Sequence, residues 1–259
     1  MADSGLALDQ LQRETIEWEE QDNVCFTRQY TAPALVRTIG PPSAGGAVLS
    51  VGCGVGTDVE TLASLGWDAH GIEPGYRNSA WDRRSMPERL HVGDGRRLPF
   101  EDDRFDALTS YGVIEHVGAV GDTVEVEPDV WEQRVLFARE CARVVAPGGA
   151  MIISTPNRLH PADYFHSPNR FGMRWHSPRE QFSLSFGDMK RLYVDEAGCR
   201  AIRPLGMADA FVFHRVREHL WGRVLAPVAK VGLGAMGWRA MEPIARSPLN
   251  PFLIVRIDR

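Results

Sequence analysis

The sequence predicts a doubly wound α/β fold, in which parallel strands alternate with helices on both faces of a sheet. An apolar run at residues 48–51 leads into three glycines spaced two apart, Gly52, Gly54 and Gly56. A second apolar run ends in a carboxylate at Glu73. A strand, a tight glycine turn and an acid at the tip of the next strand form a nucleoside-binding device in folds of this class.

The spacing of the glycines indicates which kind of nucleoside is bound. In dinucleotide-binding folds a third glycine stands three places after the second, and here that position is Thr57. No Lys-Ser or Lys-Thr pair follows, so a phosphate-cradling loop of the nucleotide-hydrolase type is excluded. The carboxylate of Glu73 can accept both hydroxyls of a ribose together.

The remaining elements follow from apolar runs and from Gly and Pro punctuation. A short strand followed by a turn is predicted over residues 90–100, and a turn followed by a strand over 102–110. Further strands are predicted at 150–155, 200–202 and 252–257. Helices are predicted over 136–145, which stops at Pro147-Gly148-Gly149, and over 180–197, which ends at Gly198. Residues 6–40 carry apolar positions among charges and predict one or two amphipathic helices.

Several of these segments, taken in order, resemble class I S-adenosylmethionine-dependent methyltransferases. The motifs are the Gly-x-Gly-x-Gly turn, Glu73, the Asp94 turn, the Leu98-Pro99-Phe100 corner, Glu115-His116 and Pro147-Gly148-Gly149. The resemblance covers residues 45–160 and is nearest to the type 11 group, which includes quinone-biosynthesis enzymes and many glycan and natural-product enzymes. It implies a Rossmann-like, mostly parallel sheet of seven strands, with the last strand antiparallel.

The resemblance also implies the cofactor, S-adenosyl-L-methionine, and the residues that bind it. The implied cofactor residues are Gly52, Cys53, Gly54 and Gly56 under the methionine part and ribose, Glu73 at the ribose hydroxyls, Asp94 and Gly95 at the adenine, and Tyr111 beside the methionine part. Two of these assignments have a structural alternative. Glu73 could be a surface acid at a strand end, and Asp94 could serve an Asx turn.

Three residues are candidates for catalysis: His116, Glu115 and His176, of which His176 could equally have a structural role beside the expected helix start. His116 is the favoured general base, because its unperturbed pKa is near neutrality and it follows the carboxyl end of the fourth strand. It could equally serve helix packing or the pocket wall. Quinone-type relatives have a Glu-x-x-Glu-His pattern here that can bind a divalent metal, but Gly112 replaces the first Glu. We therefore predict no complete metal site, with a two-ligand Mg²⁺ site at Glu115 and His116 as the alternative.

The chain divides into four predicted segments. They are an N-terminal helical cap at 1–40, the cofactor-binding core at 41–206, a helical insertion at 207–248 and the final core strand at 249–259. The insertion is amphipathic and basic over 215–246, which fits a lid, a homodimer surface or a contact with a membrane or lipid-linked substrate. The acidic segment 118–132 is predicted to be a solvated loop.

Loops after the fifth strand mix polar and aromatic side chains, which suits a hydroxyl-rich or aromatic acceptor. They contain Thr155-Pro156-Asn157-Arg158, His160, Asp163, Tyr164, His166 and Trp175-His176-Ser177. Such a Thr-Pro-Asn…His pattern resembles methyltransferases of glycan pathways.

The sequence thus predicts a cytoplasmic methyltransferase that methylates a hydroxyl of a small molecule or sugar. A formal net charge of −5 argues against a nucleic-acid partner and thereby against an RNA methyltransferase. Four cysteines without metal-ligand spacing suit a reducing compartment, and no export signal is evident. Two further alternatives are an S-adenosylmethionine-binding regulatory or assembly protein without activity, and an NAD(P)-dependent oxidoreductase.

Overall fold

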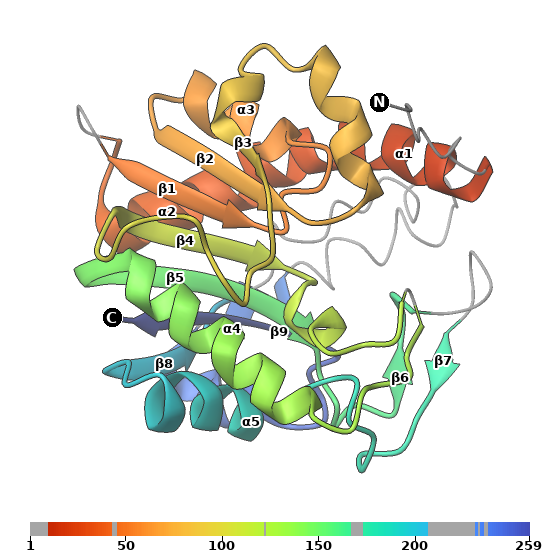
Figure 1. Ribbon diagram of the computed structural model, residues 1–259. Helices are drawn as coiled ribbons and strands as arrows, with labels where there is room; N and C mark the ends of the chain where they lie inside the picture. Colours follow the sequence, from red (N-terminus) through yellow and green to blue (C-terminus); the bar gives the residue numbers. More distant parts are fainter. Residues whose placement is uncertain are drawn as a thin grey trace.

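The computed structural model describes residues 10–42, 46–121, 123–166, 173–206, 231–232, 234–235 and 238–259. Their central element is a seven-stranded sheet with helices on both faces (Figure 1). The strands are β1 Ala47–Val51, β2 Asp68–Glu73, β3 Leu90–Val92, β4 Phe105–Tyr111, β5 Val145–Pro156, β8 Ala201–Pro204 and β9 Phe252–Asp258. The predicted α/β class is confirmed.

The strand order across the sheet is β3-β2-β1-β4-β5-β9-β8. Strands β3, β2, β1, β4 and β5 are paired in parallel, whereas β9 runs antiparallel to both β5 and β8. The predicted sheet with an antiparallel last strand is therefore confirmed. The order reverses between β1 and β4, and ligands of open α/β sheets bind outside the carboxyl ends of the strands at such a point.

Each face of the sheet has its own apolar core. On one face, α2 (Ala32–Ile39) and α3 (Thr57–Ser64) bury Leu35 and Leu62. On the other, α4 (Val130–Val144) and α5 (Phe186–Lys190) bury Phe137 and Met189. Strands such as β1 are buried along their whole length, as expected where helices cover both faces.

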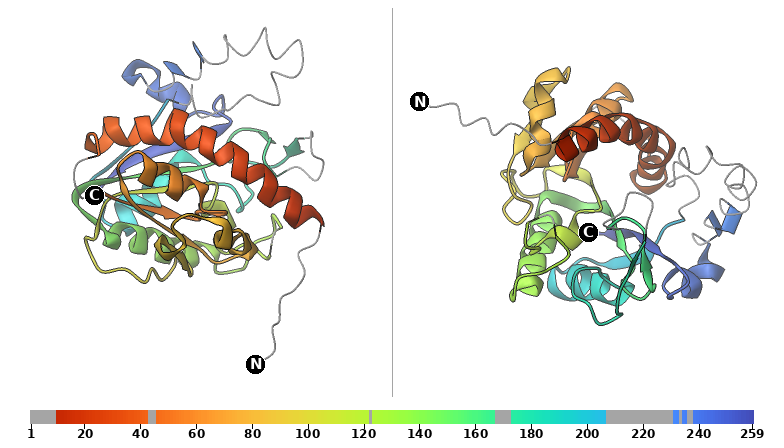
Figure 2. Two further views of the ribbon diagram at one scale, coloured as in Figure 1. Left: turned by 90° about the horizontal axis from the view of Figure 1, so that it is seen from above. Right: turned by 90° about the vertical axis from the view of Figure 1, so that its right-hand side faces the viewer.

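The N-terminal segment forms nearly continuous helix, in agreement with the predicted amphipathic helices. Helix α1 (Gln10–Phe26) crosses the width of the molecule and continues through the π-helical η1 (Thr27–Thr31) into α2 (Figure 2). Ion pairs hold α1 against the 3₁₀ helix η2 (Tyr76–Arg83), which begins just after β2. Glu19 pairs with Arg77 at 2.7 Å, and Glu20 pairs with Arg83 at 2.7 Å and with Arg84, the residue after η2, at 2.6 Å.

Three predicted boundaries were wrong. The helix predicted over 136–145 is α4, which begins already at Val130 and ends at Val144. The helix predicted over 180–197 begins only at Phe186, because Ser185 and Asp188 form a reciprocal capping box at that point. It continues through the π-helical η5 (Arg191–Glu196), and Gly198 follows with a positive φ of 72°. The fifth strand was predicted from residue 150 but begins at Val145, so that Pro147-Gly148-Gly149 lies within it.

Short elements complete the description. They are the 3₁₀ helices η3 Pro87–Arg89, η4 Ile114–His116 and η6 Arg239–Met241, the helix α8 Glu242–Ala245, and an antiparallel pair of strands, β6 Ala162–Asp163 and β7 Arg174–Trp175. Most of the predicted insertion at 207–248 lies outside the described residues. The expected role of 215–246 as a lid, a homodimer surface or a membrane contact therefore stays a prediction. Among the described residues, no helix combines the length and the apolar character needed to cross a bilayer.

Candidate functional site

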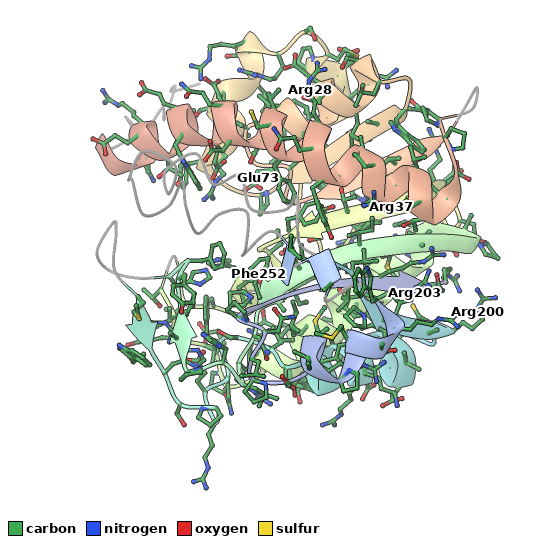
Figure 3. All side chains as sticks on the ribbon, turned by 180° about the vertical axis from the view of Figure 1, so that it is seen from behind. Arg28, Arg37, Glu73, Arg200, Arg203 and Phe252 are labelled. Carbon is green, nitrogen blue, oxygen red and sulfur yellow. The ribbon has the colours of Figure 1, made fainter. Side chains whose placement is uncertain are left out.

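A cavity of about 1100 Å³ lies at the carboxyl ends of β1, β2, β4 and β5, where the strand order reverses. Helix α1, from the segment predicted as an N-terminal helical cap, contributes Trp18, Asp22 and Phe26 to its wall. Figure 3 shows Glu73, from the part of the sheet nearest α1, and Phe252, from the start of β9; both line the cavity. The predicted site residues that line it are Gly52, Gly54, Glu73, Asp94, Gly95, Tyr111, Glu115 and His116.

Two backbone amides hold the carboxylate of Glu73 at the cavity wall. The Gly54 N–H donates to Oε2 at 3.2 Å, and the Gly75 N–H donates to Oε1 at 3.0 Å. The side chain is buried, with only 7% of the residue exposed. A carboxylate offers about four acceptor positions, so each oxygen keeps a lone pair for a ribose hydroxyl. This arrangement fits the predicted role of Glu73 rather than that of a surface acid.

Replacing Glu73 by alanine is expected to weaken the affinity for S-adenosylhomocysteine by about 10–100-fold, because charge-assisted hydrogen bonds to the ribose are lost. Isothermal titration calorimetry measures the affinity. Glu88→Ala, at an exposed acid of η3, is the matched control and should leave the affinity unchanged. Equal affinities of the Glu73 variant and the parent protein would remove Glu73 from the ribose site.

The turn between β1 and α3 requires glycine at position 52. Gly52 has a φ of +76°, and a Cβ built there would lie 2.3 Å from Cγ2 of Val113. At Gly54, with a φ of +52°, a Cβ would lie 2.8 Å from Oε2 of Glu19 in α1. The backbone thus turns through left-handed conformations with neighbouring side chains in contact, which brings it close to the cavity.

Gly52→Ala is expected to lower the free energy of unfolding by about 2–5 kcal/mol, because the left-handed backbone and the clash with Val113 both contribute. Gly198→Ala is the matched control: its φ is +72°, but nothing lies within 4 Å of the new Cβ. That variant should lose only about 1–2 kcal/mol. Urea unfolding measures both losses. Equal losses in the two variants would contradict the close packing of Val113 against Gly52.

Other predicted cofactor residues differ in where they lie. Asp94 lines the cavity, but it also forms the Asx turn that was the alternative, since its Oδ1 accepts the Arg96 N–H at 2.8 Å. The Arg96 guanidinium holds the pKa of Asp94 below its usual value although burial opposes this. Gly56 does not line the cavity, because it packs on Leu90, where a Cβ would lie 2.7 Å from Cδ1. Cys53 is buried and lines a separate small cavity.

This small cavity, of about 70 Å³, lies beneath the glycine turn and contains a carboxyl whose role the sequence did not indicate. Asp58, in the first turn of α3, lines it and forms a 2.5 Å hydrogen bond with the Ser50 hydroxyl. Burial raises the pKa of Asp58 to about 6, although hydrogen bonds from Ser50 and from the Val59 amide oppose the shift. At pH values between the ordinary pKa of an aspartate and about 6, the folded chain therefore binds more protons than the unfolded chain.

Stability should consequently fall as the pH rises through this window. We expect the parent protein to lose about 1–3 kcal/mol of unfolding free energy relative to Asp58→Asn between about pH 4 and pH 7. The variant keeps a neutral side chain of the same shape at all these pH values, so their difference isolates Asp58. Urea unfolding at several pH values measures it. A difference that does not change with pH would contradict the raised pKa.

Glu115 and His116 lie side by side in η4, and the fold adds a third group to them. His166, from the loop after β6, points its Nε2 at Nε2 of His116 over 3.1 Å. Glu115 is buried, and burial raises the pKa of its carboxyl to about 7 although His166 opposes this. All three side chains line the cavity, and we call them the acceptor-side cluster. The sequence placed His166 among the acceptor loops but gave it no role.

Asp163 orients His166 within this cluster. Its Oδ2 accepts a hydrogen bond from Nδ1 of His166 at 2.9 Å, and its Oδ1 accepts the His166 N–H at 3.2 Å. Arg174 of β7 also bonds to Asp163 at 3.1 Å. These hydrogen bonds hold the pKa of the Asp163 carboxyl below its usual range despite its burial. The imidazole is thereby fixed with its Nε2 toward His116.

Arg134 of α4 fastens the loop that carries the cluster. Its buried guanidinium donates to the carbonyl oxygens of Glu115 at 2.9 Å and Val117 at 3.2 Å. It also donates to Gln181 and Phe182, both at 2.7 Å. Desolvation lowers the pKa of Arg134 to about 10. The sequence gave no signal for this role, because the four partners are backbone atoms from distant segments.

The structure does not bring His176, the third candidate, to the cavity. Its ring is buried, and Nδ1 lies 3.2 Å from Oε1 of Glu180. The acidic segment 118–132, predicted as a solvated loop, contributes Glu127 and Asp129 to the cavity wall. Aromatic side chains border the acceptor-side cluster: Phe182 lies edge-on to His116 and His166, and Phe165 packs on Phe252 with ring centroids 4.6 Å apart.

Comparison with known proteins agrees with this geometry. Residues 49–153 match the family model described as a methyltransferase domain. A probable S-adenosylmethionine-dependent methyltransferase of Mycolicibacterium smegmatis is 29% identical over 56% of this chain and 50% of its own. The ubiquinone biosynthesis O-methyltransferase of Azorhizobium caulinodans is 33% identical over 45% of this chain and 43% of its own. The chain therefore spans about half the length, or less, of these curated relatives.

A solved structure shows a similar fold over nearly the whole chain. Phosphoethanolamine N-methyltransferase 2 of Haemonchus contortus, in complex with S-adenosyl-L-methionine, aligns with a TM-score of 0.51 at 16% identity. The alignment covers 97% of this chain and 60% of that one. From the family match, the relatives and the glycine turn with Glu73, we conclude that residues 49–153 form a methyltransferase domain of the class I S-adenosylmethionine-dependent kind, with S-adenosylmethionine as its cofactor.

Proposed function

We propose that this protein methylates a hydroxyl oxygen of a small molecule or sugar. The observation that carries the proposal is that the acceptor-side cluster opens into the same cavity as Glu73. One cavity thus holds a ribose-binding carboxylate and a group of side chains that can take up a proton. A cofactor-binding protein without activity has no need of the second feature.

The protein's part in the reaction is to bind, align and remove a proton. The cofactor supplies a methyl group on a positively charged sulfur, which is already activated for transfer. Glu73 and the glycine turn fix the nucleoside, and Trp18 and Phe26 of α1 provide apolar surface in the wall of the cavity. Alignment of the reactants alone can contribute about 7–11 kcal/mol to lowering the barrier.

In the transfer step, an acceptor oxygen lone pair forms the new O–C bond while the C–S bond breaks and its electron pair remains on sulfur, giving S-adenosylhomocysteine. The hydroxyl proton leaves through the acceptor-side cluster, where His116 lies at the cavity surface. Proton removal by a positioned group contributes typically ~10²–10⁴-fold. This requirement favours an oxygen acceptor, because a neutral amine can attack without first losing a proton.

The surroundings of the cluster support the acceptor class. The rings of Phe165 and Phe252 offer flat apolar faces, while Ser154 and His116 offer polar groups in the same wall. Such a mixture suits an aromatic or sugar hydroxyl. The O-methyltransferase named among the relatives supports the same choice, and the predicted glycan or natural-product branch is part of this proposal.

The test is transfer of an isotopically labelled methyl group from S-adenosylmethionine to a panel of phenols and sugars, with the corresponding amines as the matched set. We expect labelled methyl ethers and S-adenosylhomocysteine in equal amounts, identified by mass spectrometry. Transfer to the amines alone would contradict the acceptor class. Binding of S-adenosylhomocysteine without transfer to any acceptor of the panel would favour a regulatory or assembly protein.

A further inference from the structure

The geometry of the acceptor-side cluster matches the coordination shell of a metal ion. One ligand atom from each of Glu115, His116 and His166 can be chosen so that all lie within 4.8 Å of one another. The Nε2 atoms of His116 and His166 are 3.1 Å apart. Two imidazole nitrogens on one tetrahedral ion, with bonds of about 2.0–2.1 Å, stand about 3.3–3.4 Å apart, so a shift of about 0.2–0.3 Å would bring the two rings to that separation.

The tautomer of His166 is the one that a ligand requires. Nδ1 of His166 donates to the buried carboxylate of Asp163 at 2.9 Å, so its Nε2 carries the lone pair. A carboxylate behind the distal nitrogen is the usual partner of a metal-binding histidine, because it fixes the ring and raises its basicity. Without an ion, the short contact requires His116 to donate a proton to His166.

Glu115 provides a second, independent observation. The residue is 1% exposed, and its Oε2 atom has no hydrogen-bond partner in the described part of the chain. A buried carboxylate oxygen without a donor is costly and calls for an explanation. A cation between Glu115 and the two imidazoles would satisfy this oxygen.

We propose that Glu115, His116 and His166 bind one divalent transition-metal ion of the Zn²⁺ type. Two imidazoles and one carboxylate favour such an ion over Mg²⁺, which prefers oxygen ligands and keeps its water. His166 lies outside the matched residues 49–153 and supplies the ligand that Gly112 cannot. The complete set exists only in the folded chain, which is why the sequence predicted no full metal site.

Three protein ligands leave the remaining positions of the ion open toward the cavity. The chemistry that such an ion supplies is a lower pKa for a hydroxyl placed beside it. His116 then serves as a ligand, and the proton passes to solvent. This role rests on the proposed function, whereas the binding of the ion does not.

Binding can be tested without cofactor or acceptor. Protein dialysed against a chelator is titrated with ZnCl₂ by calorimetry, and bound zinc is counted by mass spectrometry. CoCl₂ serves as a second probe, whose visible absorption reports coordination by imidazole and carboxylate. We expect one ion per chain, at least 10-fold weaker binding in His116→Ala and in His166→Ala, and about 10–100-fold weaker binding in Asp163→Asn.

His91→Ala is the matched control, since His91 forms the other close histidine pair among the described residues, 3.5 Å from His70. It should bind zinc as the parent protein does. The proposal would be overturned if the parent protein bound no more zinc than the His116→Ala/His166→Ala double variant. It would also be overturned if His91→Ala lost as much zinc affinity as the variants of the cluster. Circular dichroism confirms that the variants fold, and the cobalt spectrum of the parent needs no variant. Zinc binding without methyl transfer would refute only the proposed function.

Discussion

Replacing His116 by alanine is expected to lower the turnover number by about 10²–10⁴-fold while leaving the affinity for S-adenosylhomocysteine nearly unchanged. His116 belongs to the acceptor-side cluster, and its ring meets His166 rather than Glu73 or the glycine turn. The variant should therefore be impaired in removing the proton from the acceptor. This holds whether the imidazole takes up the proton itself or binds an ion that assists the departure of the proton. Steady-state kinetics with labelled S-adenosylmethionine, together with calorimetry, separate turnover from cofactor binding.

The matched control is His91→Ala, because His91 lies on β3 among His70 and Phe100 and does not line the cavity. This variant should retain turnover within about twofold. If His116→Ala turned over as fast as the parent protein, His116 would only form part of the cavity wall and would not take part in proton removal. If the variant instead lost affinity for S-adenosylhomocysteine and kept its turnover, His116 would belong to the cofactor site, and its assignment to the acceptor-side cluster would be wrong.

Arg134→Met is expected to lower the free energy of unfolding by about 3–4 kcal/mol, because it leaves four backbone carbonyls without their buried donor. Arg134 is only 3% exposed, and its guanidinium joins η4 to residues 181–182. Methionine keeps most of the side-chain volume, so the change removes the hydrogen bonds with little cavity. Urea unfolding measures the loss.

Arg139→Met on the same helix is the control. The Arg139 side chain is 57% exposed and bonds only to Glu196 among the described residues, so its loss should cost less than about 1 kcal/mol. Similar losses for the two variants would show that Arg134 does not fasten the η4 loop. Zinc binding by the Arg134 variant gives a second readout, since a loosened η4 would misplace Glu115 and His116.

The cofactor side of the site could be predicted from the sequence because its signals are local. A buried strand, glycines at fixed spacing and an acid at the next strand end identify Gly52, Gly54 and Glu73 within one β-α-β unit. The seven strands of the central sheet could be predicted for the same reason, since apolar runs and glycine or proline punctuation mark them, whereas the two-residue strands β6 and β7 were not predicted. The helix boundary at Phe186 was missed because the start was placed at Glu180, whereas the capping box of Ser185 and Asp188 begins the helix after Ser185.

The acceptor side depends on contacts between distant parts of the chain. His166 is fifty positions from His116, and the two meet only because β6 and β7 turn the loop after β5 back over η4. Arg134 likewise donates to backbone carbonyl groups of distant segments, and no pattern of residue types in the sequence predicts such contacts. For His176 the sequence left a catalytic and a structural role open, and the pairing with Glu180 outside the cavity favours the structural one.

A crystal structure grown with S-adenosylhomocysteine tests the central claim most directly, namely that one cavity holds the nucleoside at Glu73 and directs the sulfur toward the acceptor-side cluster. We predict density for the ribose hydroxyls within hydrogen-bond distance of both Glu73 oxygens, with the sulfur on the side of Glu115, His116 and His166. Density for the nucleoside elsewhere, or a sulfur directed away from that cluster, would contradict the account.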